Sequence, residues 1–164
     1  MRKLILFIIL ILSLAGAVDA GYLLVQTVSG KAVVCPSVPV GRFNLNQCNI
    51  VLATPYAKFL GLPTALYGLV AYLFFAILAL YELACQNFTN LGGQAGKRSN
   101  AIKFLMYLSG LGVFVSIYFV YLQFFVINAL CFYCLTSATV MTLIFILSIA
   151  YNNRYSREIF SAGV

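Results

Sequence analysis

The sequence predicts an all-α integral membrane protein, a bundle of four transmembrane helices with one long loop on its outer side. Hydrophobic residues make up 63% of the 164-residue chain and charged residues 8%, against about 45–50% and about 25% in soluble domains. A chain of this size cannot hide so much apolar surface in its own core, which places it in a bilayer. Four apolar runs are each long enough for the ~20 residues that a spanning helix needs.

The first apolar run follows two basic residues and predicts a transmembrane helix over residues 4–28. The competing interpretation is a signal peptide cleaved at Val18-Asp19-Ala20, after a short apolar region. The apolar run continues through residues 21–25, and this favours the spanning helix. Asp19 would then lie near the outer end of the helix, either as a solvated charge or as a functional acid.

Residues 29–62 form the only long polar stretch and predict a loop, because Pro, Gly and Asn punctuate it. Within this loop, apolar residues recur at helical spacing over Asn49–Leu60. They predict a short amphipathic helix on the bundle or in the membrane interface. Pro55 would weaken or kink this helix unless it falls in the first turn.

The rest of the chain predicts three more spanning helices, no strand, no repeat and no second domain, so residues 1–164 form one membrane domain. Pro63 fits the first turn of the second helix. Only residues 128–130 separate the third helix from the fourth, so these two must be antiparallel neighbours. The expected elements are helices over 63–84, 101–127 and 131–151, a loop over 85–100 and a tail over 152–164.

Basic residues divide unevenly between the two sides of the predicted bundle. One side has three, and the other has seven. The positive-inside rule places the richer side in the cytoplasm. Both termini are then cytoplasmic in a multi-pass protein of the cell membrane, and the 29–62 loop is exofacial. The exofacial, oxidising side receives four thiols, Cys35, Cys48, Cys131 and Cys134, whereas Cys85 falls on the cytoplasmic side.

Composition excludes several functions. The chain has no His, and therefore no His-based triad, imidazole base or His metal site. The net charge of +7 is interpreted as loop charge that sets orientation, not as a nucleic-acid footprint. The five cysteines leave at least one without a partner in the chain, and Cys85 is expected to be a free, packed thiol.

Four exofacial thiols allow three interpretations. Two static disulfides would brace the bundle, and Cys35–Cys48 would contribute roughly 3 kcal/mol through loop closure. A zinc site is disfavoured, because the spacing of Cys35 and Cys48 does not match a zinc knuckle. In the third, a redox relay, the loop pair exchanges electrons with the pair at the helix end.

The segment Cys131-Phe132-Tyr133-Cys134 is a C-x-x-C motif, which is typical of redox centres. Two thiols three residues apart share a helix face, and the positive end of the helix dipole favours the reactive thiolate. A relay also needs a final acceptor, and no flavin, haem or nucleotide motif is present. A membrane-soluble quinone fits. Aromatic side chains could line its pocket, or they could simply face lipid: Phe114, Tyr118, Tyr121, Phe124, Phe125, Phe132 and Tyr133.

Two segments resemble the vitamin K epoxide reductase family. They are CNIVLATPYAKFLGLP, residues 48–63 with the continuation to Tyr72, and CFYCLTS, residues 131–137. Cys35 completes the family's loop pair, and the resemblance covers nearly the whole chain. It implies a four-helix bundle around a quinone of the ubiquinone or menaquinone type, capped by the loop and a short half-helix.

The resemblance also implies a role for each cysteine. Cys134 would lie against the quinone and pass electrons to it. Cys131 would exchange with Cys48, and Cys35 would meet an external thiol partner. Thr54 would offer its hydroxyl to a quinone oxygen.

Thr64 and Ala138 stand where vertebrate members carry an asparagine and a tyrosine, which argues against tailored vitamin K epoxide reduction. The cofactor site is expected to comprise Thr54, Thr64, Phe114, Tyr118 and Cys134.

The predicted function is a membrane thiol:quinone oxidoreductase that generates disulfides in an extracytoplasmic thioredoxin-like protein. The chain ends at Val164 without a fused thioredoxin-like domain, so that partner is expected to be separate. No metal and no nucleic acid are expected as partners. Two alternatives stay open: a reductase acting on the quinone or its epoxide, and a non-catalytic scaffold with two static disulfides.

Overall fold

A computed structural model describes residues 2–36, 39–40, 43–88 and 95–161. Four helices in this part of the chain are long and apolar enough to cross a membrane. The predicted all-α membrane bundle is therefore confirmed. The helices are α1 (Arg2–Ser29), α3 (Thr64–Phe88), α4 (Ala95–Tyr121) and α5 (Phe132–Ser161).

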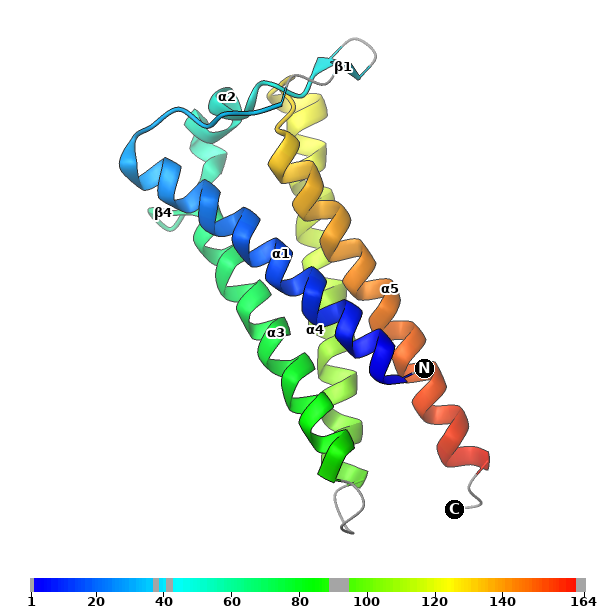
Figure 1. The fold of residues 1–164 in the computed structure, drawn as a ribbon. Coiled ribbons are helices and arrows are strands. Elements are labelled where there is room, and N and C mark those ends of the chain that lie inside the picture. The colour runs from blue at the N-terminus through cyan, green and yellow to red at the C-terminus, as the bar shows by residue number, and fades with distance from the viewer. Residues whose placement is uncertain (1, 37–38, 41–42, 89–94, 162–164) are drawn as a thin grey trace.

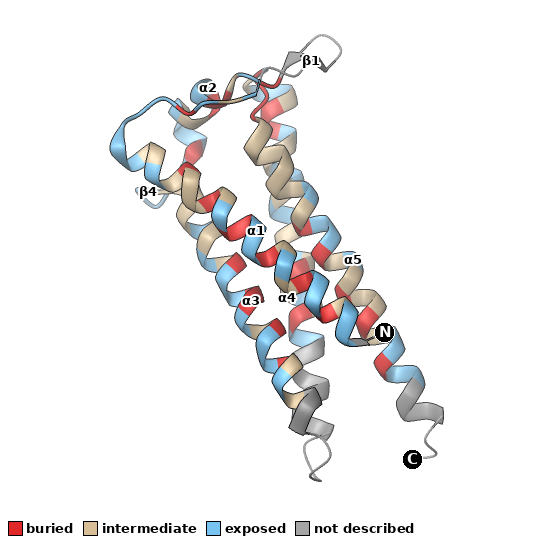
Figure 2. Ribbon diagram, viewed as in Figure 1, coloured by how far each residue is buried: buried red, intermediate tan, exposed pale blue. Residues whose placement is uncertain are grey.

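Helix α1 crosses the bundle obliquely and packs on both α3 and α5, while α4 packs mainly on α5 (Figure 1). Buried residues recur along each of the four long helices (Figure 2), and Ile9, Phe75, Leu105 and Ile144 belong to the main cluster. Large apolar side chains cover much of the outer surface, as expected for a surface in contact with lipid.

The ring of Tyr72 of α3 lies directly against α1 at Gly16. A Cβ atom at this position would lie 2.5 Å from Cε1 of Tyr72, which is too close for any other residue without a shift of the ring. Small residues allow such close packing of membrane helices. The Tyr72 ring can therefore cross under α1 toward α5.

The segment between α1 and α3 forms a cap over one end of the bundle. The described residues of the cap include four strands of two residues each, so the expectation of no strands was wrong. The strands form two antiparallel pairs, β1 with β2 and β3 with β4. The cap elements are β1 (Pro39–Val40), β2 (Phe43–Asn44), α2 (Cys48–Ala53), η1 (Pro55–Ala57), β3 (Lys58–Phe59) and β4 (Leu62–Pro63).

The short helix of the cap ends earlier than predicted. Helix α2 stops at Ala53, and Thr54 is extended, with φ −71° and ψ 153°. The ring of Pro55 disfavours helical backbone in the residue before it, which explains the break. In place of the expected helix over Asn49–Leu60, the chain forms the short helix α2, the 3₁₀ turn η1 and the strand β3.

The long helices also extend beyond the predicted spans. Helix α3 continues to Phe88, α4 begins at Ala95 and α5 runs to Ser161, so the predicted loop over 85–100 and tail over 152–164 are partly helical. Lys, Arg and Gln are good helix formers, so a helix continues in water where its apolar stretch ends. At the other end, Pro63 lies in β4, just before α3, and not in its first turn.

A short π-helix, η2 (Leu122–Val126), follows α4 and leads into the turn before α5. In this turn Asn128 has a positive φ of 52°, a backbone conformation that asparagine tolerates better than most residues. The turn delivers the chain directly beneath the cap, where Cys131 forms an antiparallel β-bridge with Asn46.

Candidate redox site

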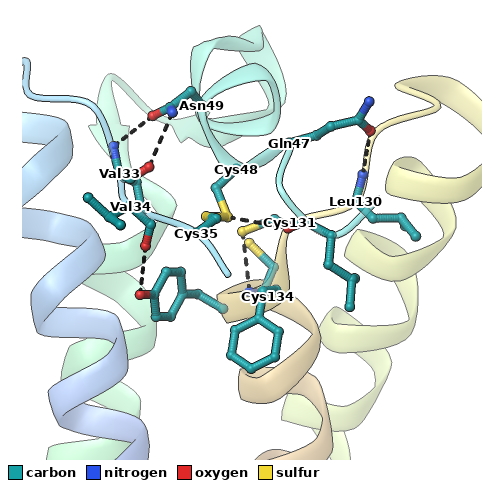
Figure 3. Close-up of a disulfide and its surroundings, with 12 residues drawn as sticks. Val33, Val34, Cys35, Gln47, Cys48, Asn49, Leu130, Cys131 and Cys134 are labelled. Carbon is teal, nitrogen blue, oxygen red and sulfur yellow. Dashed lines mark hydrogen bonds between the residues drawn. A yellow bond between two sulfur atoms is a disulfide. The ribbon is translucent and has the colours of Figure 1, made fainter. Parts of the chain in front are cut away.

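The four cysteines predicted to be exofacial lie together where the cap meets the start of α5 (Figure 3). Cys35 and Cys48 form a disulfide, whereas Cys131 and Cys134 are free thiols. All four belong to one cluster of buried and partly buried side chains. The structure thus has an oxidised outer pair next to a reduced inner pair, and the second disulfide of a static scaffold is not formed.

Burial of the four sulfurs varies in a way that suits a relay. Cys48 and Cys131 are both 0% exposed. Cys35, on the cap segment, and Cys134, inside the first turn of α5, are partly exposed. The sulfurs that would exchange with each other are thus shielded from water, and the two others remain open to different surroundings.

Cys131 occupies the N-cap position of α5. Its Sγ accepts a hydrogen bond of 3.4 Å from the backbone N–H of Cys134, in the place where an N-cap oxygen usually stands. The hydrogen bond from the Cys134 thiol is the main cause that lowers the pKa of Cys131, and backbone N–H groups of Cys134 and Tyr133 act in the same direction. Burial and the charge of Asp19 oppose this shift. Thiolate, the reactive form, is therefore favoured at Cys131.

Two glutamines that the sequence analysis did not single out hold the residues at the start of α5. The backbone N–H of Gln47 donates to the Leu130 carbonyl at 3.2 Å, and its Oε1 accepts from the Leu130 N–H at 3.3 Å. Gln123, only 2% exposed, accepts from the Cys131 N–H at 2.9 Å. A polar residue within an apolar span is a known sign of function, and could have identified Gln123.

The segment that carries Cys35 is held from two directions. Asn49 of α2 accepts a 2.7 Å hydrogen bond from the Val33 N–H and donates one of 3.2 Å to the Val33 carbonyl. The Tyr133 hydroxyl donates to the Val34 carbonyl at 3.0 Å. Tyr133, which was considered for the quinone pocket, therefore braces the cap instead, and its ring packs on Tyr22 with centroids 5.2 Å apart.

A cavity of about 840 Å³ lies beneath the cap among all four long helices. Its wall is mostly apolar with a few polar groups, and its size is within the usual range for small-molecule sites. Four of the five residues expected at the cofactor site line this cavity: Thr54, Thr64, Tyr118 and Cys134.

Phe114, the fifth expected residue, does not line the cavity and is 74% exposed. The inner face of this part of α4 is formed by Gly112, Val115 and Ser116, so Phe114 points outward. Helical spacing alone does not distinguish a lipid-facing aromatic side chain from one at a cavity.

Two hydroxyl groups face the cavity while already bonded to backbone. Thr54 donates to the Val51 carbonyl at 2.7 Å, and Thr64 donates to the Ala57 carbonyl at 3.1 Å. A hydroxyl has one hydrogen, so each presents only acceptor lone pairs to a bound molecule in this arrangement. Thr54 must rotate if it is to donate to a quinone oxygen.

Three of the other aromatic candidates lie elsewhere. A separate groove of about 580 Å³ runs between α4 and α5 and is lined by Tyr121, Phe124 and Phe125.

Cys85 lies in α3, outside the thiol cluster. Within the described residues, no group of three or more Cys, Asp or Glu side chains is placed to hold a metal ion.

A disulfide packed against a C-x-x-C dithiol, beside an apolar cavity in a four-helix bundle, defines a membrane redox protein. The family model of the vitamin K epoxide reductase family matches residues 7–149. The chain belongs to this family, and membership implies oxidoreductase activity in the membrane. Members generally use quinones as electron carriers and typically work with thioredoxin-like proteins. A search of curated proteins gave no match to the chain.

Proposed function

We propose that this protein oxidises dithiols of a separate thioredoxin-like protein outside the cytoplasm and passes the electrons to a quinone of the ubiquinone or menaquinone type. One observation carries the proposal. The buried Cys131 thiol lies beneath the Cys35–Cys48 disulfide, and its neighbour Cys134 lines the cavity. The sulfurs thus form a continuous path from the cap to a site of suitable size.

Electrons enter at the outer pair. A thiolate of the partner attacks Cys35, the partly exposed sulfur of the disulfide, and Cys48 leaves as a thiolate. The second thiol of the partner then displaces Cys35. The partner leaves with a disulfide, and the outer pair holds two electrons as a dithiol.

The internal transfer uses the two fully buried sulfurs. The Cys48 thiolate attacks Cys131 of an oxidised inner pair, which releases Cys134. Cys35 then attacks Cys48, which restores the outer disulfide and releases Cys131. The state described here, with the outer pair oxidised and the inner pair reduced, corresponds to the product of this transfer.

The inner pair is oxidised again at the cavity. Cys131 and Cys134 form their disulfide and lose two electrons and two protons, and a bound quinone would accept both. Cys134, Thr54, Thr64 and Tyr118 would hold it, since all line the cavity. Each 30 mV by which the acceptor exceeds the dithiol in potential contributes about 1.4 kcal/mol of driving force.

The proposed orientation places both termini in the cytoplasm and the cap outside. The ends of α1 and α5 that carry the termini lie opposite the cap (Figure 1), in agreement with the positive-inside count. A membrane-impermeant thiol reagent added to intact cells should not reach Cys85. Labelling of Cys85 from outside would contradict this orientation.

The central experiment is Cys134→Ala in purified protein with quinone and a reduced thioredoxin-like protein. We expect quinone reduction to stop, because no inner disulfide can form, while Cys85→Ala keeps the wild-type rate. Continued quinone reduction by Cys134→Ala would refute the relay. Faster turnover of a quinone epoxide than of partner thiols would favour the alternative epoxide reductase.

A second variant tests the entry step. Cys35→Ser should abolish oxidation of the protein partner, whereas a small membrane-permeant dithiol should still reduce the inner pair directly. Loss of both reactions would show that Cys35 is needed for the fold of the cap and not only for contact with the partner.

A further inference from the structure

Asp19 of α1 lines the same cavity as Cys134 of α5. Its Oδ2 atom is buried and makes no hydrogen bond within the described structure. A carboxyl oxygen left without a partner in a protein interior costs free energy, and ionisable groups within membrane-spanning segments mark functional sites. Packing alone therefore does not account for a carboxylate at this position.

The other groups at the cavity make Asp19 distinctive. It is the only carboxyl group among the lining residues, and the chain has no histidine. At neutral pH the ordinary phenol and ammonium pKa values, about 10 and about 10.4, make Tyr and Lys poor proton acceptors. The titratable or charged groups that share the cavity are Tyr56 and Lys58 of the cap, Tyr67 and Tyr72 of α3, Tyr118 of α4 and Cys134 of α5.

Tyr72 also lines the cavity, and it contacts both α1 and α5. Its ring passes Gly16, one turn from Asp19 on α1. Its hydroxyl bonds Ser137 at 2.8 Å, one turn from Cys134 on α5. The Tyr72 hydroxyl is therefore engaged with α5, and the buried Oδ2 atom of Asp19 keeps no hydrogen-bond partner within the described residues.

Asp19 also acts on the dithiol through its charge. Its carboxylate raises the pKa of Cys131, against the larger lowering by the hydrogen bond from the Cys134 thiol. Asp19 is thus connected to Cys134 by the cavity that both residues line, and its charge is one of the causes that act on Cys131.

We propose that Asp19 is the proton-transfer group for reduction of the quinone, an inference that rests on the function proposed above. As the Cys131–Cys134 bond forms, the S–H bond of Cys134 breaks and two electrons leave the pair, because Cys131 reacts as the thiolate and has already lost its proton. The Asp19 carboxylate accepts a proton from the Cys134 thiol and delivers it to a quinone oxygen. Overall the dithiol loses two electrons and two protons, the quinone gains both, and Asp19 returns to its starting form.

The test compares Asp19→Asn and Asp19→Glu in purified protein, with Glu82→Gln as a control for loss of a buried acid outside the cavity. Asp19→Asn should slow quinone reduction about 10²-fold or more, the usual range for loss of a positioned proton-transfer group. Asp19→Glu should recover much of the rate. Glu82→Gln should stay within about threefold of wild type, an order-of-magnitude margin well below that range.

A second readout needs no quinone. Thiolate absorbance of the reduced inner pair, measured against Cys131→Ser, reports the titration of Cys131. Asp19→Asn should shift this titration to lower pH, because an opposing negative charge is gone. The variant would then have a more reactive thiol and yet a slower turnover, a combination that a merely structural role does not produce.

Three outcomes would overturn the inference: an Asp19→Asn rate within threefold of wild type, equal losses in the Asn and Glu variants, or an unchanged Cys131 titration. Cys134→Ala in the same assay distinguishes failure of the proposed function from failure of the role of Asp19. If Cys134→Ala remains active, the proposed function itself fails. If Cys134→Ala is inactive and Asp19→Asn is active, only the role of Asp19 fails.

Discussion

Gln123 holds the first cysteine of the C-x-x-C motif, because its Oε1 accepts a 2.9 Å hydrogen bond from the Cys131 N–H. Gln123 lies in the π-helix η2 that follows α4. Segments of π-helix are rare in proteins, and those that occur often lie at functional sites. Here the wider turn brings a side chain of the third spanning helix beneath the start of the fourth.

Replacing Gln123 should therefore destabilise the start of α5. Gln123→Leu leaves the buried Cys131 N–H without an acceptor, which costs about 1–3 kcal/mol. We expect this loss in denaturant unfolding of the detergent-solubilised protein. Gln123→Glu keeps an acceptor oxygen and should lose less. Equal losses of unfolding free energy in Gln123→Leu and Gln123→Glu would show that the hydrogen bond to Cys131 is unimportant.

The cap should open more easily without Asn49. Asn49→Ala removes both hydrogen bonds to Val33. Val33 is only 5% exposed, so its N–H is left without an acceptor, which costs about 1–3 kcal/mol of free energy. Amide hydrogen exchange at Val33 should become faster. Asn49→Asp retains the acceptor of the shorter bond, so its amide exchange rate at Val33 should lie between those of Asn49→Ala and wild type. Exchange at the wild-type rate in Asn49→Ala would contradict the assigned clamp.

The Cys131 thiol should titrate below the ordinary cysteine pKa of about 8.5. The Cys134 thiol donates the hydrogen bond that is the main cause of the lowered pKa, so thiolate persists as the pH falls below the ordinary value. Cys134→Ala should raise the pKa of Cys131, and Cys134→Ser, which keeps a donor, should largely preserve it. Ultraviolet thiolate absorbance measures both. An unchanged or lower pKa of Cys131 in Cys134→Ala would contradict the role assigned to this hydrogen bond.

The close approach of α1 and α3 gives a matched pair of glycine substitutions. In Gly16→Ala the new methyl group would overlap the Tyr72 ring, and we expect a loss of about 1–3 kcal/mol in unfolding free energy from overpacking. In Gly21→Ala the nearest atom would be Leu69 Cδ1 at 3.9 Å, an ordinary contact. That variant should be neutral or gain up to about 1 kcal/mol of helix propensity. Equal effects of the two changes would exclude the ring contact as the cause.

The sequence was sufficient for the fold class because hydropathy is a strong signal in a membrane protein. Positions within the cap were harder to predict. Asn49–Leu60 has the apolar spacing of a helix, but Pro55 breaks it after one and a half turns. Residue pairs that are distant in sequence, such as Gln47 with Leu130, leave no local pattern to read.

The candidate site was predictable only where the residue type restricts the chemistry. Cys35, Cys48, Cys131 and Cys134 could be proposed from composition and spacing, and the structure brings them together. Which aromatic side chains face the cavity depends on the rotation of each helix, which has no signature in the sequence: Tyr118 lines the cavity and Phe114 does not. Asp19 was ambiguous from the sequence, because a charge near a helix end is often simply hydrated.

The four sulfurs and the cavity occupy the capped end of the bundle, and the other half of each helix carries no part of the proposed path. Electrons would thus travel sideways, from a dissolved dithiol to a carrier at nearly the same depth. No charge would cross the bilayer thickness during a catalytic cycle. Energised and de-energised vesicles should then turn over at the same rate, because membrane voltage acts only on charge that moves along the membrane normal.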